Sequence, residues 1–87
     1  MVDFPVDQTS INIIDARGLA CPLPLLKLKQ GLNNLVTGEC LQILVTDPAS
    51  VKDFHAFAEL SHHCLIDFKK DGETYHYLFV KGAKTVE

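Results

Sequence analysis

One short segment of this 87-residue chain holds the residue types that a reactive thiol site needs. It reads Asp15-Ala16-Arg17-Gly18-Leu19-Ala20-Cys21-Pro22-Leu23-Pro24 and joins a predicted strand to a predicted helix. A residue before proline avoids the α region, so Cys21 suits the N-cap of that helix, with Pro22 as the first helical residue. A helix that starts only at Pro24 is the alternative, because Leu23 also precedes a proline. Because a helix N-terminus favours a thiolate, we expect Cys21 to be an exposed nucleophile with a lowered pKa.

The neighbours of this cysteine each have an expected part in holding it. Pro22 and Pro24 lack an N–H group and stiffen the helix start, so the Leu23 N–H remains as the donor that caps onto the Cys21 sulfur. Gly18 permits a tight loop, and Arg17 adds positive charge nearby.

Two aspartates are expected near the same loop. Asp47 suits the N-cap of a second helix, which begins at Pro48. If the first two strands are parallel, their carboxyl ends share one sheet edge, and Asp15 and Asp47 then hold the Cys21 loop through its backbone. Two carboxylates near a thiolate oppose its ionisation, so the sequence leaves the electrostatic balance at Cys21 open.

The other potential ligands and nucleophiles favour ordinary roles. Cys40 and Cys64 lie in apolar strands and are expected to pack in the core. His62, His63 and Cys64 are consecutive, and neighbouring strand residues point to opposite faces, so they do not form a metal site without a distorted loop. We expect the histidines to be solvated surface residues. We also expect the protein to use no metal and no cofactor.

The periodicity of apolar residues predicts the elements that position the cysteine. Ser10 to Asp15 partly alternates and indicates a strand, and Leu25, Leu28, Leu32 and Leu35 follow a helical spacing that ends at Thr37-Gly38. Glu39 to Thr46 indicates a buried central strand. Helical spacing returns after Asp47, with an apolar face of Val51, Phe54, Phe57 or Ala58, and Leu60. The alternation of Cys64, Ile66 and Phe68 indicates a third strand, and Lys70 to Glu73 a hairpin turn into a fourth, Thr74 to Val80.

The order β-α-β-α-β-β predicts an α+β fold: a two-layer sandwich with both helices on one face of a four-stranded mixed sheet. Its other face stays partly open and carries apolar residues, which makes it a possible partner surface. We expect a single domain over residues 1–87 with its core at about 10–83, a loose arm at 1–9 and a frayed tail at 83–87.

Composition excludes several classes of protein. A hydrophobic fraction of 47% with 22% charged residues is typical of a globular chain rather than a disordered one. The net charge of −3, with Arg17 as the sole arginine, disfavours direct nucleic-acid binding. No apolar run approaches the ~20 residues that span a bilayer, and the N-terminus shows no secretory signal. Three cysteines without a CxxC motif fit a reducing cytoplasm.

Cys21 has no histidine near it in sequence, no phosphate-binding glycine loop and too little chain around it for a deep pocket. A nucleophile without acid–base machinery suits a carrier that takes a sulfur atom and passes it on while its partners supply catalysis. The motifs resemble those of the TusA/SirA family of small sulfur carriers over about residues 10–83. They are Asp15-x-x-Gly18-x-x-Cys21-Pro22-x-Pro24, Gly38-Glu39, Asp47-Pro48-Ala49, and the Tyr75–Lys81 strand followed by Gly82.

This resemblance implies a fold like the C-terminal domain of translation initiation factor three. It also implies that Cys21 accepts a persulfide sulfur from a cysteine desulfurase or rhodanese and relays it to an acceptor protein. In TusA proper the sulfur goes toward 2-thiouridine in tRNA, whereas relatives serve molybdenum cofactor, sulfur oxidation or selenium pathways. Two positions differ from TusA proper, both on the expected docking surface: Thr46-Asp47 replaces paired acidic residues, and Leu23 replaces glutamate.

Three hypotheses remain at this stage. The first is a cytoplasmic sulfurtransferase-type carrier with Cys21 as the persulfide site, rather than a self-sufficient enzyme. The second is a regulatory or scaffold domain that binds a partner through the open sheet face. The third is a thiol redox protein, disfavoured because no resolving cysteine is evident; it predicts a disulfide between Cys21 and Cys40 or Cys64.

Overall fold

Six elements follow one another in the predicted order. The structure, a computed structural model, describes residues 11–82, so the expectations for residues 1–10 and 83–87 lie outside it. The elements are β1 (Ile11–Ala16), α2 (Leu23–Asn33), β2 (Cys40–Val45), α3 (Pro48–Leu60), β3 (Cys64–Asp71) and β4 (Thr74–Val80). None of the helices in the described part of the chain is long and apolar enough to cross a membrane.

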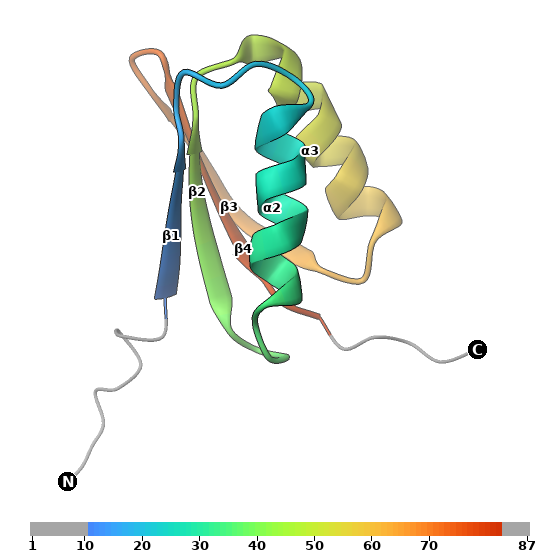
Figure 1. Cartoon of the computed structure of the whole chain (residues 1–87). Helices are drawn as coiled ribbons and strands as arrows, with labels where there is room; N and C mark the ends of the chain where they lie inside the picture. Colours follow the sequence, from blue (N-terminus) through green and yellow to red (C-terminus); the bar gives the residue numbers. More distant parts are fainter. Residues whose placement is uncertain (1–10, 83–87) are drawn as a thin grey trace, which may run out of the picture.

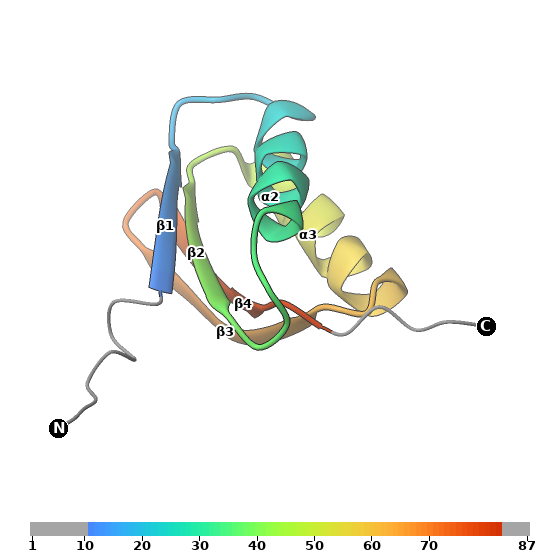
Figure 2. The same cartoon turned by 60° about the horizontal axis from the view of Figure 1, so that its bottom comes forward.

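The four strands form one mixed sheet in the order β1-β2-β4-β3. β1 and β2 are parallel, so the chain must cross over between them, and α2 provides that crossover. β4 is antiparallel to both β2 and β3. Both helices cover the same face of the sheet, as Figures 1 and 2 show from two directions, which confirms the predicted two-layer α+β fold.

The core lies between the sheet and the two helices. Leu28 and Leu32 of α2 are fully buried, and Leu25 and Leu35 pack against them, as the helical spacing predicted. From α3 comes Phe54, whose ring meets those of Tyr77 and Phe79 on β4. The remaining buried hydrophobic residues come from the strands: Ala16, Leu41, Ile43 and Val45.

Two expected core contacts are wrong. The predicted alternation of Cys64, Ile66 and Phe68 fails because a β-bulge between Leu65 and Asp67 shifts the register of β3 against β4. A bulge adds one residue to a strand, so the residues before it point to the opposite faces from those that an unbroken alternation would give. Leu65 therefore packs on the core, while Cys64 and Ile66 are exposed. Leu60 is 87% exposed, because it is the last residue of α3 and lies beyond the edge of the core.

The topology brings three connections to one end of the sheet. The loop after β1 and the loop after β2 lie there because these strands are parallel, and the β3–β4 hairpin turns at the same end (Figure 1). Gly72 takes a positive φ of 63° in that hairpin, as the predicted Asp-Gly turn requires. The segment with Cys21 thus lies beside the start of α3.

Candidate functional site

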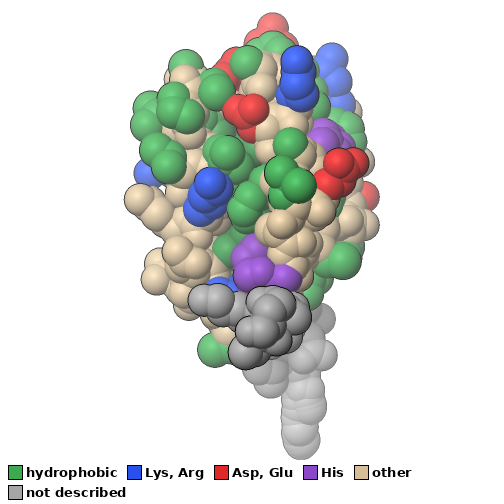
Figure 3. Space-filling model, turned by 90° about the vertical axis from the view of Figure 1, so that its right-hand side faces the viewer, with side chains coloured by type: hydrophobic (Ala, Val, Ile, Leu, Met, Phe, Trp, Pro, Cys, Tyr) green, Lys and Arg blue, Asp and Glu red, His purple; other side chains and the backbone are tan. Residues whose placement is uncertain are grey.

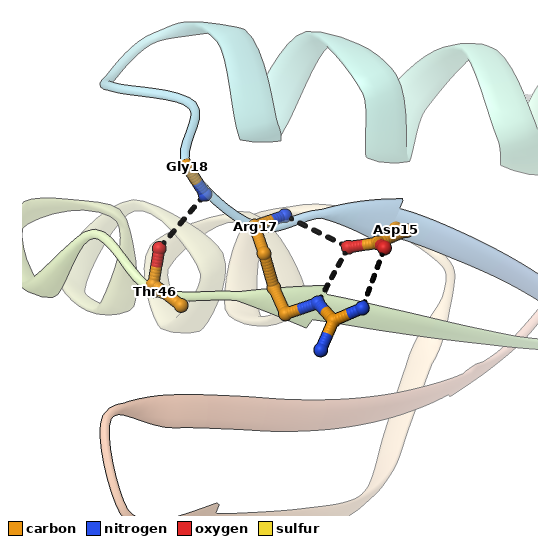
Figure 4. Close-up of polar contacts among 4 residues, drawn as sticks. All are labelled: Asp15, Arg17, Gly18 and Thr46. Atoms are coloured by element: carbon orange, nitrogen blue, oxygen red, sulfur yellow. Dashed lines mark hydrogen bonds and ion pairs between the residues drawn. The ribbon is translucent and has the colours of Figure 1, made fainter.

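The loop that carries Cys21 begins with a local ion pair. The Arg17 side chain donates to both carboxylate oxygens of Asp15, over 2.8 and 2.7 Å, and the Arg17 N–H donates to the same carboxylate (Figure 4). These hydrogen bonds from Arg17 lower the pKa of Asp15 to about 2. The positive charge expected to assist Cys21 is therefore directed toward Asp15.

Gly18 makes the turn that Figure 4 shows next to this pair. Its φ of +82° lies in the left-handed region, which side chains with a Cβ rarely adopt, so the predicted need for glycine is confirmed. The Gly18 N–H donates to the Thr46 hydroxyl over 2.9 Å, which ties the loop to the residue after β2.

The helix start differs from the prediction. α2 begins at Leu23, with Pro22 at the N-cap and no side-chain capping bond, and the Cys21–Pro22 peptide bond is cis. The Leu23 N–H donates to the carbonyl of Ala20 over 2.9 Å, so it is not available to the sulfur. The expectation that Cys21 itself caps the helix is therefore wrong: Cys21 lies one residue earlier, inside a tight turn.

Two carboxylates hold Cys21 instead, one from the N-cap of α3 and one from within the helix. Asp47 accepts the Cys21 N–H over 2.7 Å, as predicted for a carboxylate that fixes the loop through its backbone. It also caps α3 by accepting from the Ala49 N–H over 3.2 Å. The Cys21 thiol donates to Asp53 over 3.0 Å. Cys21 is exposed, so its thiol lies at the surface beside the N-terminal half of α3.

The charges at the site reverse the expected effect on the thiol. The hydrogen bond to Asp53 is the main cause that raises the pKa of Cys21 above its ordinary value, with desolvation and the charges of Asp53 and Asp47 adding to it. The prediction of a lowered pKa is therefore wrong for the free protein. The pKa of Asp47 is lowered, mainly because it accepts the Cys21 N–H.

Asp53 was not singled out from the sequence. One feature of the sequence indicates that Asp53 lies near the buried face of α3. It comes one helical turn after the buried Ser50 and next to the buried Phe54. A residue there borders the face of α3 that packs on the protein. That its side chain reaches Cys21 depends on how α2 and α3 approach each other, which periodicity does not fix.

A groove between the helices leads away from Asp53. It is lined by Asp53 itself, Lys29 and the hydrophobic residues Leu25, Ala56, Phe57 and Leu60, with Ser61 at its end. Hydrophobic side chains, a lysine and acidic groups lie together on the face drawn in Figure 3. The Lys29 ammonium lies 5.9 Å from the centroid of the Phe57 ring.

The other candidate residues stay away from Cys21. Cys40 is half-buried at the start of β2 and Cys64 exposed at the start of β3, so the core role fits Cys40 in part and not Cys64. His63 differs from the predicted solvated histidine: it stacks on Phe57, accepts the Gly82 N–H over 3.1 Å, and burial lowers its pKa. Within residues 11–82 no group of three histidine, cysteine or acidic side chains has the geometry to hold a metal ion.

Comparisons with known proteins identify the family of this chain. The family model described as sulfurtransferase TusA matches residues 12–81. The chain is 46% identical over 82 residues to a sulfur carrier protein TusA of Allochromatium vinosum, covering 94% of this chain and all of that protein. This chain belongs to the TusA family.

Two further relatives extend the comparison. A Bacillus subtilis protein, YrkF, named as a candidate sulfur carrier, is 36% identical over 72 residues; the match covers 83% of this chain and 39% of that protein. The crystal structure of a SirA-like protein from Desulfitobacterium hafniense superposes with a TM-score of 0.71 at 28% identity, over 84% of this chain and 99% of that one. The fold and the family of sulfur carriers are thus shown, which leaves the chemistry at Cys21 to be tested.

Proposed function

We propose that Cys21 carries sulfur as a persulfide. It accepts the sulfur from a cysteine desulfurase or a rhodanese and passes it to an acceptor protein in the cytoplasm, with 2-thiouridine in tRNA as one destination of the relay. The observation that supports this most directly is the placement of the thiol. Cys21 is exposed at the end of the sheet, with its N–H fixed by Asp47 and its sulfur by Asp53.

The transfer step balances without an oxidant or a reductant. The Cys21 sulfur attacks the outer sulfur of the donor's persulfide, a new S–S bond forms at Cys21, and the S–S bond of the donor breaks. The donor's inner sulfur leaves as a thiolate, and the proton lost by the Cys21 thiol restores it to a thiol. A second exchange of the same kind hands the outer sulfur to the acceptor and returns Cys21 to its starting state.

The surroundings of Cys21 support a carrier rather than a self-sufficient enzyme. In the described part of the chain, the side chains that hydrogen-bond to it are the carboxylates of Asp47 and Asp53, and no histidine does so. The groove beside Asp53 is shallow and opens to solvent along the helices, so it does not enclose a small substrate. A partner protein must supply the remaining groups.

Intact-mass spectrometry after incubation with a cysteine desulfurase and cysteine tests this function. We expect one added sulfur on the wild type and on Cys64→Ser, whose cysteine is also exposed, and none on Cys21→Ser. Sulfur that persists on Cys21→Ser, or that disappears in Cys64→Ser, contradicts the proposal. Incubation with an acceptor protein then shows whether the added sulfur leaves Cys21.

A second function is favoured by the open face of the sheet. Both helices pack on the other face, and Ile13 of β1 is 65% exposed. A regulatory or scaffold domain would bind its partner through this face without sulfur transfer. Cys21→Ala would then leave function unchanged, whereas the carrier hypothesis predicts its complete loss.

A further inference from the structure

The thiol of Cys21 is held in a negative environment. Asp53 of α3 accepts its S–H over 3.0 Å, and Asp47, the N-cap of the same helix, accepts the N–H of Cys21 over 2.7 Å, so two carboxylates face the cysteine. A carboxylate in this position is satisfied by a neutral thiol and opposed by a thiolate. Attack on a persulfide requires the thiolate. In the free carrier, the surroundings of Cys21 therefore disfavour the thiolate that sulfur transfer requires.

No lysine or arginine within residues 11–82 forms an ion pair with either of these carboxylates. The only ion pair in that range joins Arg17 to Asp15, and two of its hydrogen bonds use the guanidinium. The first turn of α2, which follows Cys21, contains no charged residue. Lys29 lines the groove next to Asp53 but lies over the ring of Phe57 and makes no ion pair with that carboxylate.

We propose that Asp53 is a specificity-determining latch: it keeps Cys21 as a neutral thiol in the free carrier, and a cationic side chain of the sulfur donor releases it by pairing with Asp53. This proposal rests on the sulfur-carrier function and adds the chemistry of the partner. Once the donor's cation pairs with Asp53, that carboxylate no longer accepts the Cys21 S–H and its charge no longer opposes a thiolate. The Cys21 thiolate then forms next to the donor's persulfide. Thiol reagents without such a cation meet the protected form.

The first test measures the latch without sulfur transfer. Iodoacetamide alkylation of Cys21 is followed by peptide mass spectrometry across pH for the wild type, Asp53→Asn, Asp53→Glu and Glu59→Gln. Glu59 is an exposed acid on the same helix, so its variant makes the same charge change away from the thiol. We expect Asp53→Asn to react several-fold faster at neutral pH with its alkylation midpoint shifted down. Glu59→Gln should match the wild type, and Asp53→Glu should stay close to it.

A profile of Asp53→Asn that superposes on the wild type overturns the latch. Far-UV circular dichroism and thermal melting of the same samples show whether each variant is folded. Asp53→Glu is the control for a disturbed helix, because it changes the side chain and keeps the carboxylate. Slow alkylation in Asp53→Glu together with fast alkylation in Asp53→Asn assigns the effect to the carboxylate.

The second test measures the partner's charge. The initial rate of sulfur loading by a cysteine desulfurase is followed by intact mass at increasing salt concentrations. We expect the wild type and Glu59→Gln to lose rate steeply as salt rises, and Asp53→Asn to depend on salt less steeply, because one attractive charge pair is gone. Equal slopes for Asp53→Asn and the wild type overturn the cationic release. A wild type that never gains sulfur would contradict the proposed function instead, while the alkylation profile still decides the latch.

Discussion

At the scale of single residues, a cysteine's chemistry depends on the acceptor its sulfur meets. The sequence shows a thiol before a helix and two aspartates near it, and it correctly places Asp47 on the Cys21 loop. It does not show that the thiol meets Asp53, because that contact depends on how α2 and α3 approach each other. The predicted lowering of the Cys21 pKa is therefore wrong, whereas the prediction that Cys21 is exposed is confirmed.

The Asp15–Arg17 pair should make stability depend on pH in a defined window. The folded-state pKa of Asp15 is lowered to about 2, below the ordinary value of about 3.9, so the unfolded chain binds more protons between these values. The contribution of the pair is fully present above about pH 4 and is lost as pH falls toward 2.

Urea unfolding of the wild type and Asp15→Asn from pH 2 to 6 measures this effect. The wild type should exceed the variant in unfolding free energy at pH 5–6, and the difference should shrink below pH 4. The pair is exposed, so we expect the difference to be small and to diminish in high salt. A difference that does not change with pH would show that the ion pair does not cause it.

Tyr77 offers a stability test inside the core. Its hydroxyl is buried and has no hydrogen-bond partner among residues 11–82, and burial raises the pKa of Tyr77 to about 12. A buried donor without a partner costs about 1–3 kcal/mol. The free energy of unfolding in urea should therefore be equal to that of the wild type in Tyr77→Phe, or higher by up to about 1 kcal/mol. Tyr75 is half-buried on the same strand, and Tyr75→Phe should change this free energy little. A clear loss for Tyr77→Phe alone would reveal a partner for the hydroxyl.

At the scale of elements, apolar patterning and turn residues were sufficient to predict that all four strands and both helices exist. It works because a buried leucine stripe and an alternating strand each have a single way to reach a common core. It fails where backbone geometry decides. The bulge in β3 exchanges the faces of Cys64 and Leu65, and the turn at Ala20–Leu23 uses the N–H that was assigned to the cysteine. Neither feature leaves a repeating pattern in the sequence.

The loop between β1 and α2 should depend on one glycine conformation. Gly18 has a φ of +82°, and a Cβ there would meet no atom within 4 Å, so the cost of substitution is purely conformational. Gly18→Ala should lose about 1 kcal/mol of unfolding free energy, and Gly18→Asn less, because asparagine tolerates the left-handed region better. Urea unfolding measures both variants. Equal losses for alanine and asparagine would indicate that lost contacts, not backbone conformation, cause the effect.

At the scale of the whole molecule, the sheet separates Cys21 from the other two thiols, because Cys40 and Cys64 both pair with Val80 at the opposite end of the sheet. Cys40 begins β2 opposite Ile11, whereas Cys21 follows the other end of β1 and is bound by Asp47 beyond the far end of β2. The five residue steps from Cys40 to Val45 along β2 span about 16 Å, and a disulfide needs Cα atoms within about 7 Å.

Oxidation should therefore form no disulfide within one molecule between Cys21 and either Cys40 or Cys64. Diamide treatment of the dilute protein, followed by non-reducing peptide mapping, tests this. Cys21 should appear as a free thiol or in links between two molecules. A substantial intramolecular Cys21–Cys64 peptide would support the redox hypothesis over the carrier hypothesis.

The parallel pairing of β1 and β2 has a practical consequence for tagged forms of the protein. β1 starts and β4 finishes at the end of the sheet opposite the Cys21 loop (Figure 1). A purification tag, a fluorescent label or a fused protein attached through either end of the fold should consequently leave the cysteine accessible, so sulfur loading can be assayed on immobilised protein.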